Sequence, residues 1–147
     1  MAILEDIRAG FAAAITAAFP DVQCTGYLIE NPTPPCFEVE PGEDGVTYDM
    51  SMQRGFDDWT FTVRGIVSAG LSLGAQKRLD AWLNSSGSQS VKTKLEANRT
   101  LPVDGVATVS DLRVLRASGP RQFAVISTPG TPYLGAEWVV RVIATGT

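Results

Sequence analysis

Apolar side chains near the start of the chain recur at the spacing of a helix. They lie three or four positions apart along one stripe, at Ile3, Leu4, Ile7, Phe11, Ile15 and Phe19. Residues at this spacing share one face of an α-helix, and Pro20 cannot continue the helix because it has no backbone N–H. We therefore predict an amphipathic helix over residues 3–19.

The clearest strand pattern lies in the middle of the chain, over residues 58–67. One set of alternate positions is apolar and comprises Trp59, Phe61, Val63 and Val67, and the other set is polar and comprises Asp58, Thr60, Thr62 and Arg64. Successive side chains of a strand point to opposite faces of the sheet. One face of this strand is therefore expected to be buried, and the other to be wet or covered by a partner.

Shorter segments with alternating or apolar patterns predict further strands. They cover residues 22–29, 36–40, 46–53, 105–117, 121–127 and 133–144. Residues 31–35 are rich in proline and predict an extended connection, and residues 41–45 predict a turn. In the last strand the apolar residues share one face, at Leu134, Ala136, Trp138, Val140 and Val142.

Two short helical segments separate the central strand from the C-terminal strands. Apolar stripes predict helices over residues 71–83 and 90–97, and the segment after Asn98 ends the helical region. Helices and strands are segregated along the chain and do not alternate regularly. We therefore predict one α+β domain over residues 1–147, with a mostly antiparallel β-sheet packed against an N-terminal helix and a central pair of short helices.

Three segments in this order resemble the tail terminator proteins of long-tailed, siphovirus-like bacteriophages, in particular those that infect actinobacteria. The first is the turn at 54–57, which reads Arg-Gly-Phe-Asp. The second is the helix pair, joined by the Ser/Gly segment at 85–88 and by Ser90-Val91-Lys92. The third is the strand that begins Tyr133-Leu134-Gly135-Ala136-Glu137. Together with the segments around them they cover about two thirds of the chain, and none is a catalytic signature.

The resemblance implies a structural role in the virion. Tail terminator proteins form a ring, hexameric in this family, that caps the tail tube, ends its polymerisation and joins it to the head-side connector. The implied partners are other copies of the chain, the tail tube protein and a head–tail connector or neck protein. DNA would pass through the lumen without specific binding, no membrane is involved, and the chain would be made in the host cytoplasm. A head completion or neck connector protein, a minor tail tube protein and a tail-assembly chaperone are the alternatives.

Composition limits the chemistry that the chain can perform. It contains no histidine, which excludes Ser-His-Asp and Cys-His catalysis and metal sites with histidine ligands. Its two cysteines, Cys24 and Cys36, belong to no metal-binding motif, and we expect two reduced, buried thiols in preference to a disulfide. We expect no cofactor and no enzymatic activity.

Charge is distributed unevenly along the chain. Residues 1–58 carry eleven acidic and two basic residues, a charge of −9, whereas residues 59–147 carry ten basic and five acidic residues, a charge of +5. The basic residues are scattered along strands without interleaved aromatic residues, which disfavours a nucleic-acid interface. Two interpretations remain open: a solvated surface, or acidic and basic surfaces that meet between neighbouring subunits.

One segment matches the motif of a serine nucleophile. Gly70-Leu71-Ser72-Leu73-Gly74 reads G-x-S-x-G between a predicted strand and a predicted helix. A serine nucleophile needs a base to accept its proton, and the chain has no histidine for this. We therefore reject a serine hydrolase and predict that the Ser72 hydroxyl caps the following helix.

The acidic clusters do not predict a metal site. Asp57 and Asp58 are neighbours on a strand and point to opposite faces, so they cannot share one ion. The acidic residues around the 41–45 turn lack the ligand spacing of a calcium loop and are expected to be solvated; they are Glu38, Glu40, Glu43 and Asp44. The tryptophans Trp59, Trp82 and Trp138 fit apolar stripes and are expected in the core.

Candidate interface residues lie on a predicted hairpin arm over residues 46–57, which is either an ordinary hairpin or an arm that reaches a neighbouring subunit. They comprise Tyr48, Met50 and Met52 on the arm and Arg54 at its turn, with Asp57 pairing or capping near Arg54. On the 105–117 strand, Arg113 and Arg116 are expected to meet acids of the next subunit, such as Glu38, Glu40 or Asp49.

Overall fold

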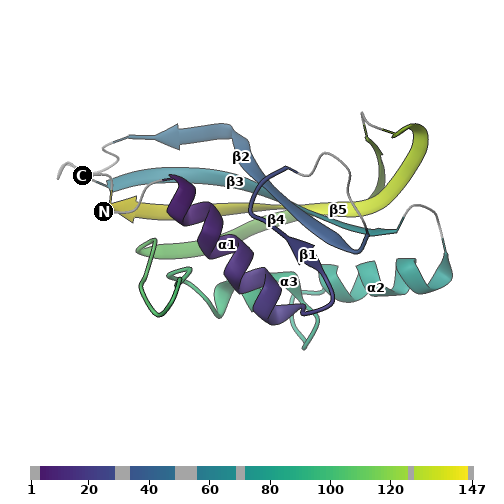
Figure 1. Ribbon diagram of the computed structural model, residues 1–147, viewed down its shortest axis with the longest axis horizontal. Helices are drawn as coiled ribbons and strands as arrows, with labels where there is room; N and C mark the ends of the chain where they lie inside the picture. Colours follow the sequence, from purple (N-terminus) through teal and green to yellow (C-terminus); the bar gives the residue numbers. More distant parts are fainter. Residues whose placement is uncertain (1–3, 29–33, 49–55, 69–71, 126–127, 146–147) are drawn as a thin grey trace.

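The order of helices and strands agrees with the predicted α+β class. The structure, a computed structural model, describes residues 4–28, 34–48, 56–68, 72–125 and 128–145. Its elements are α1 (Leu4–Ala18), β1 (Gln23–Cys24), β2 (Cys36–Thr47), β3 (Phe56–Ser68), α2 (Leu73–Leu83), α3 (Val91–Glu96), β4 (Asp111–Val125) and β5 (Thr128–Thr145) (Figure 1). The five-stranded sheet has the order β1-β2-β3-β5-β4, and every pairing is antiparallel except that of β1 with β2.

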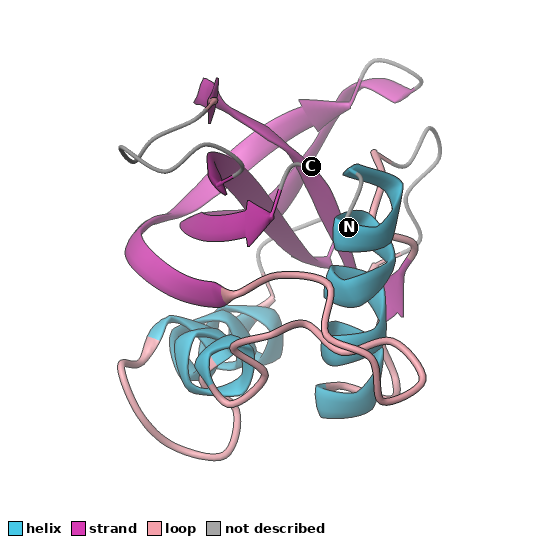
Figure 2. Cartoon of the chain, turned by 90° about the vertical axis from the view of Figure 1, so that its left-hand side faces the viewer, coloured by secondary structure: helices cyan, strands magenta, loops and turns pink. Residues whose placement is uncertain are grey.

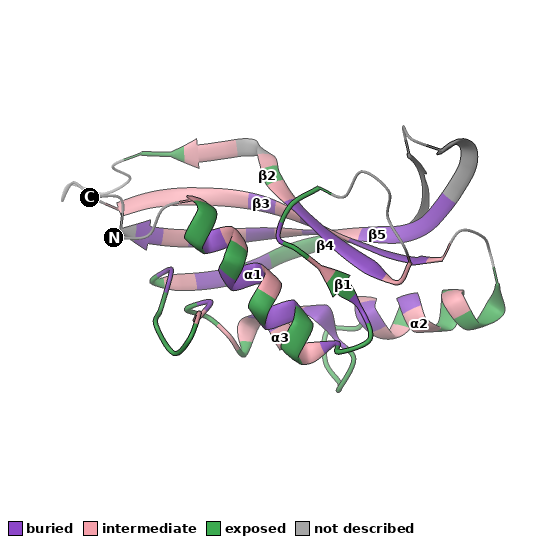
Figure 3. Ribbon diagram, in the orientation of Figure 1, coloured by how far each residue is buried: buried purple, intermediate pink, exposed green. Residues whose placement is uncertain are grey.

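The three helices lie on the same side of the twisted sheet (Figures 1 and 2). α1 contacts β1, β2 and α3, whereas α2 contacts β3, β4 and β5. Each helix buries its apolar stripe, and buried and exposed residues alternate along α1 (Figure 3). The buried residues of these stripes are Ile7, Phe11 and Ile15 in α1, Leu79 and Trp82 in α2, and Val91 and Leu95 in α3.

The side of the sheet that faces the helices is formed by the apolar positions that the alternation predicts. Phe61 and Val63 of β3 are buried, and so are the five residues that share a face of β5, namely Leu134, Ala136, Trp138, Val140 and Val142. Trp59 is partly buried and packs at the margin of this core. Full burial of one large apolar side chain stabilises a fold by about 1.5–3 kcal/mol, so this layer is the main source of stability.

Aromatic rings form the centre of the core, and a glycine makes room for them. The Phe37 ring lies 4.7 Å from that of Trp82 and 6.2 Å from that of Trp138, measured between centroids. A Cβ atom at Gly65 would lie 2.8 Å from the Phe37 ring and 3.0 Å from the rings of Trp82 and Trp138. β3 therefore passes beneath all three rings because residue 65 has no side chain.

The strand expected over residues 22–29 is wrong in length, because β1 comprises two residues. The chain leaves the sheet at Gly26, whose φ of +79° lies in the left-handed region. A Cβ atom there would lie 2.3 Å from the Arg8 carbonyl oxygen, so the backbone approaches α1 too closely for any other residue. Arg8 Nη1 also donates to the Gly26 carbonyl oxygen at 3.0 Å.

The expected turn at 41–45 does not separate two strands. β2 is a single strand that pairs with β3 on both sides of a register shift between Pro41 and Val46. In the same way, the segments expected over 105–117, 121–127 and 133–144 form one hairpin of two long strands, β4 and β5, and residues 105–110 precede β4. Bulges and turns use the same residue types, so the sequence pattern does not distinguish them.

Candidate functional site

The second face of the sheet carries the polar positions of β3, and no described helix lies over it (Figures 1 and 2). We call it the uncovered face, and at one end it also includes a small buried cluster of Cys36, Ile66 and Tyr133. The side chains of Asp58, Thr60, Thr62 and Arg64 point to it from β3 and are half-buried. They are the polar positions of the predicted alternation, so the expected separation of apolar and polar positions is confirmed, whereas covering of this face by a partner stays a prediction.

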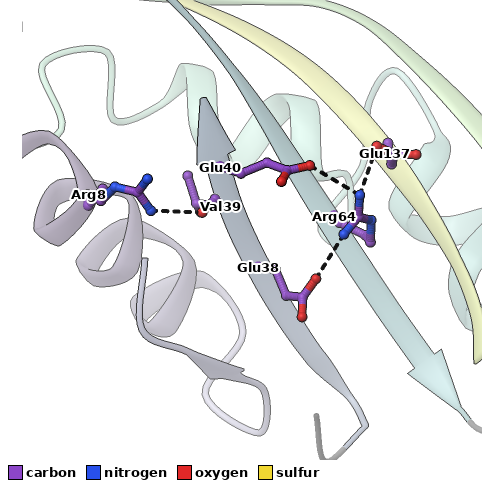
Figure 4. A network of polar contacts seen from close by, with 6 residues as sticks. All are labelled: Arg8, Glu38, Val39, Glu40, Arg64 and Glu137. Carbon is purple, nitrogen blue, oxygen red and sulfur yellow. Dashed lines mark hydrogen bonds and ion pairs between the residues drawn. The ribbon is translucent and has the colours of Figure 1, made fainter. Parts of the chain in front are cut away.

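Arg64 lies at the centre of the uncovered face and binds three carboxylates (Figure 4). Its guanidinium lies 3.0 Å from Glu38, 3.2 Å from Glu40 and 3.4 Å from Glu137, measured between nitrogen and oxygen atoms. The strand register explains the arrangement, because Glu38 of β2 and Glu137 of β5 are both direct cross-strand partners of Arg64. The Glu38 side chain is 8% exposed and that of Arg64 is 22% exposed, so water screens this network less than a surface pair.

A second ion pair lies on the same face. Arg141 of β5 binds Asp58 of β3 through Nε at 2.8 Å and Nη2 at 2.6 Å. The hydrogen bond to Asp58 raises the pKa of Arg141 above its ordinary value. Both arginines of these two networks are therefore held by carboxylates of the same chain.

Two of the acids that were expected to meet Arg113 and Arg116 of a neighbour have a partner in their own chain. Glu38 and Glu40 bind Arg64 of their own chain, and Glu38 is buried, which leaves it out of reach of a neighbouring subunit. The third expected partner, Asp49, lies outside the described residues.

β4 forms one lateral edge of the sheet, and Arg113 and Arg116 on it are exposed. Arg113 is the direct cross-strand partner of Arg141, and Arg116 follows a register shift in the strand. At the start of β4, Asp111 binds Arg99 through two contacts of 2.9 and 3.3 Å, and the hydrogen bond from Arg99 lowers the pKa of this carboxyl group. A shallow pocket of about 140 Å³ opens here, lined by Asp111, Leu112, Arg113, Arg141 and Ile143.

The remaining candidate interface residues lie elsewhere on the molecule. Tyr48 is 67% exposed just after β2, and Asp57 is half-buried in β3 in register with Ala144. Met50, Met52 and Arg54 lie outside the described residues, so the predicted arm and the pairing of Asp57 with Arg54 stay predictions. Since β2 and β4 are separated by β3 and β5, one chain does not bring Tyr48 next to the β4 arginines.

Ser72 has the capping role that we predicted. It is the N-cap of α2, and its hydroxyl oxygen accepts a hydrogen bond from the Ala75 N–H at 3.2 Å. Ser90 caps α3 in the same way, accepts from the Thr93 N–H at 3.2 Å and also donates to the Asn84 carbonyl oxygen at 2.6 Å.

Neither the cysteines nor the carboxylates of the described residues form a metal centre. In the described ranges, no group of three or more His, Cys, Asp or Glu side chains is placed to hold an ion. Cys24 and Cys36 are free thiols; Cys36 is buried as expected, whereas Cys24 is half-buried. Burial, together with the Glu38 charge and Cys24, raises the pKa of Cys36 to about 12. No described helix is long and apolar enough to span a membrane.

The alternation of β3 predicted that Asp58 and Arg64 lie on the uncovered face, whereas Glu137, Arg141 and the ion pairs among these four residues were not predicted. Their signal in the sequence is alternation, since each occupies a polar position of a strand whose other positions are apolar. A scan against protein-family models finds no match, and a search of curated proteins finds none either.

Proposed function

We propose that the chain is a structural virion protein of the tail terminator kind. In this proposal several copies, six by the family resemblance, form a ring that caps the tail tube, ends its polymerisation and joins it to the head-side connector. The observation that carries the proposal is the uncovered face of the sheet. Its β3 side chains from Asp58 to Arg64 are polar, and Arg64 and Arg141 on it are already bound to carboxylates of the same chain.

A channel that conducts DNA needs such a face. Each cation that contacts a phosphate displaces a counterion and strengthens binding, so a lumen lined by unpaired arginines would retain the DNA. On the uncovered face Arg64 is surrounded by three carboxylates, and Asp58 holds Arg141. We place this face toward the lumen and the helical layer toward the outside of the ring.

A ring also requires two unlike lateral surfaces on each subunit, because its contacts run head to tail. The strands toward the two sides of this sheet differ in charge. The sequence of β2 contains four acidic residues and no basic residue, whereas that of β4 contains three arginines and one aspartate. This difference favours contacts between unlike edges over contacts between like edges.

Tail length tests the proposal. Virions assembled without this chain are expected to carry tails of uncontrolled length, because nothing ends the addition of tube subunits. Electron micrographs of such lysates, with complementation by the wild-type gene as control, provide the measurement. Tails of normal length that fail to join filled heads would instead indicate a neck connector, and normal virions would contradict both roles.

A further inference from the structure

Four arginines lie on three neighbouring strands of the uncovered face. Arg113 of β4 is the direct cross-strand partner of Arg141 of β5, and Arg116 is the partner of Val139. Partners in neighbouring strands point to the same side of a sheet, so both β4 arginines share the face of Arg141. Arg64 lies on the same face of β3, which is the strand next to β5. Because neighbouring strands are about 4.8 Å apart, these four side chains form one patch, which we call the arginine patch.

Carboxylates on the same face outnumber the arginines of the patch. Among the described side chains of β2, β3, β4 and β5 that point to this face, five carboxylates accompany the four arginines, which gives a net charge of −1. The carboxylates are Glu38, Glu40, Asp58, Asp111 and Glu137. Three of them surround Arg64, and without their charges the net charge of this face would be +2.

The network around Arg64 contains more negative charge than one guanidinium can neutralise. A single carboxylate balances the charge of Arg64, yet three lie within 3.0 to 3.4 Å of it. The strand register brings them together, because Glu38 and Glu137 flank Arg64 from the strands on both sides. Removing charged groups from water costs free energy, so a network with two additional carboxylates is not explained by the stability of one ion pair.

The additional carboxylates lie where they oppose the approach of an anion. Guanidinium groups bind phosphate, so the arginine patch taken alone is a surface that DNA can contact. A phosphate group that reaches Arg64 lies beside three carboxylates, and because Glu38 is largely buried, water screens their repulsion less than on an open surface. The rest of the patch is balanced more evenly, since Asp58 binds Arg141 and Asp111 interacts with Arg99 and with Arg113.

We propose that Glu38, Glu40 and Glu137 form an electrostatic screen that prevents the phosphate groups of DNA from binding the arginine patch. The uncovered face is then a latent DNA-binding surface, and these three carboxylates determine the sign of its charge. The proposal rests on the ring-forming function proposed above, in which this face lines the channel, and it identifies the residues that keep the DNA from being retained there.

Removing the charge of the screen without changing its shape tests the proposal. The screen variant carries Glu38→Gln, Glu40→Gln and Glu137→Gln, and each glutamine keeps an oxygen that can accept a hydrogen bond from Arg64. Binding of the purified full chain to a short DNA duplex is measured by fluorescence anisotropy over a range of salt concentrations. We expect the screen variant to bind DNA at low salt and to lose this binding steeply as salt is added, because its arginines then displace counterions from phosphates.

A matched control removes the same amount of negative charge elsewhere. It carries Glu5→Gln, Asp80→Asn and Asp104→Asn, at exposed positions of α1, of α2 and of the turn between Val103 and Val106. Both variants have the same net charge, and we expect the screen variant to bind DNA at least about tenfold more tightly than the control. Adding Arg64→Gln to the screen variant is expected to lower its affinity and to reduce the salt slope by about one. Circular dichroism identifies a variant that fails to fold, and in that case Glu40→Gln with Glu137→Gln is compared with Glu5→Gln and Asp80→Asn.

The outcomes separate the screen from the terminator role. A screen variant that binds DNA no more tightly than its control overturns the screen, and so does a wild type that binds as tightly as the screen variant. Affinity that Arg64→Gln does not lower overturns the assignment of the screen to Arg64. The measurement requires neither a ring nor a tail. Tails of normal length in the absence of this chain would therefore contradict the terminator role even where the screen variant gains affinity for DNA.

Discussion

Two serine residues begin helices in the same way but differ in their surroundings. Ser72 is exposed and makes one capping bond, whereas Ser90 is buried and makes a second bond to Asn84. We expect Ser72→Ala to lower the free energy of unfolding by at most about 1 kcal/mol, and Ser90→Ala by about 2 kcal/mol. Urea unfolding of both variants measures this difference. An equal decrease in the free energy of unfolding for both variants would contradict the larger contribution that we assign to Ser90.

The Cys36 thiol links stability to alkaline pH. Its pKa is raised from 9.0 to about 12 in the folded chain, so the unfolded chain releases the thiol proton at lower pH than the folded chain does. The stabilising effect is complete below pH 9 and is lost as the pH rises toward 12. Between pH 9 and 12 the melting temperature of Cys36→Ala is expected to decrease less with rising pH than that of the wild type. The Cys24→Ala variant keeps the part of this decrease that is due to Cys36. Equal slopes for Cys36→Ala and the wild type would contradict this assignment.

Single residues were predictable where burial alone decides their place. The positions of Trp82 and Trp138 follow from apolar stripes, and the role of Ser72 follows from its place before a helix. The partners of Arg64 were not predictable, because they come from strands 24 to 73 residues away and depend on register. The alternation of β3 indicates that Arg64 is on the polar face and gives no information about which carboxylates lie beside it.

At the scale of elements, the packing of β3 against the aromatic cluster depends on one glycine. Gly65→Ala is expected to lower the free energy of unfolding by about 1–3 kcal/mol, because the added methyl group overlaps the rings of Phe37, Trp82 and Trp138. Gly74→Ala in α2 is the control, since a Cβ atom there meets nothing within 4 Å and alanine favours helix. Denaturant midpoints compare the two variants, and a Gly65→Ala variant as stable as the wild type would show that the rings move aside.

The elements themselves were predictable in type more often than in extent. The helix expected over 3–19 is α1, and both short helices occur where their stripes indicate. The errors lie in the β segments, where the residues of the expected turn at 41–45 form a bulge. After Pro41 the chain returns to the same partner strand, with Val46 in register with Trp59, and this return depends on β3 and not on the local sequence.

At the scale of the whole molecule, the fold class followed from the segregation of helices and strands, whereas the sheet order did not. The order β1-β2-β3-β5-β4 places the acidic β2 and the basic β4 at opposite sides of the sheet. Composition reveals only that the two halves of the chain differ in charge. Because of the sheet order, the charge difference between the two halves of the chain becomes a charge difference between two sides of the molecule. Head-to-tail assembly requires two unlike sides of this kind.

In the proposed ring, the unlike sides of the subunit have a consequence for mixed populations of subunits. If its contacts run head to tail, a copy altered on one side alone would still join a growing ring through its intact side and would offer nothing to the next copy on the other. Such a copy acts as a chain stopper, and one of them is enough to leave a circle open. When the two forms are made together, the fraction of closed rings would therefore equal the wild-type fraction raised to the number of copies in the ring. A minority of altered subunits would then prevent closure of most rings.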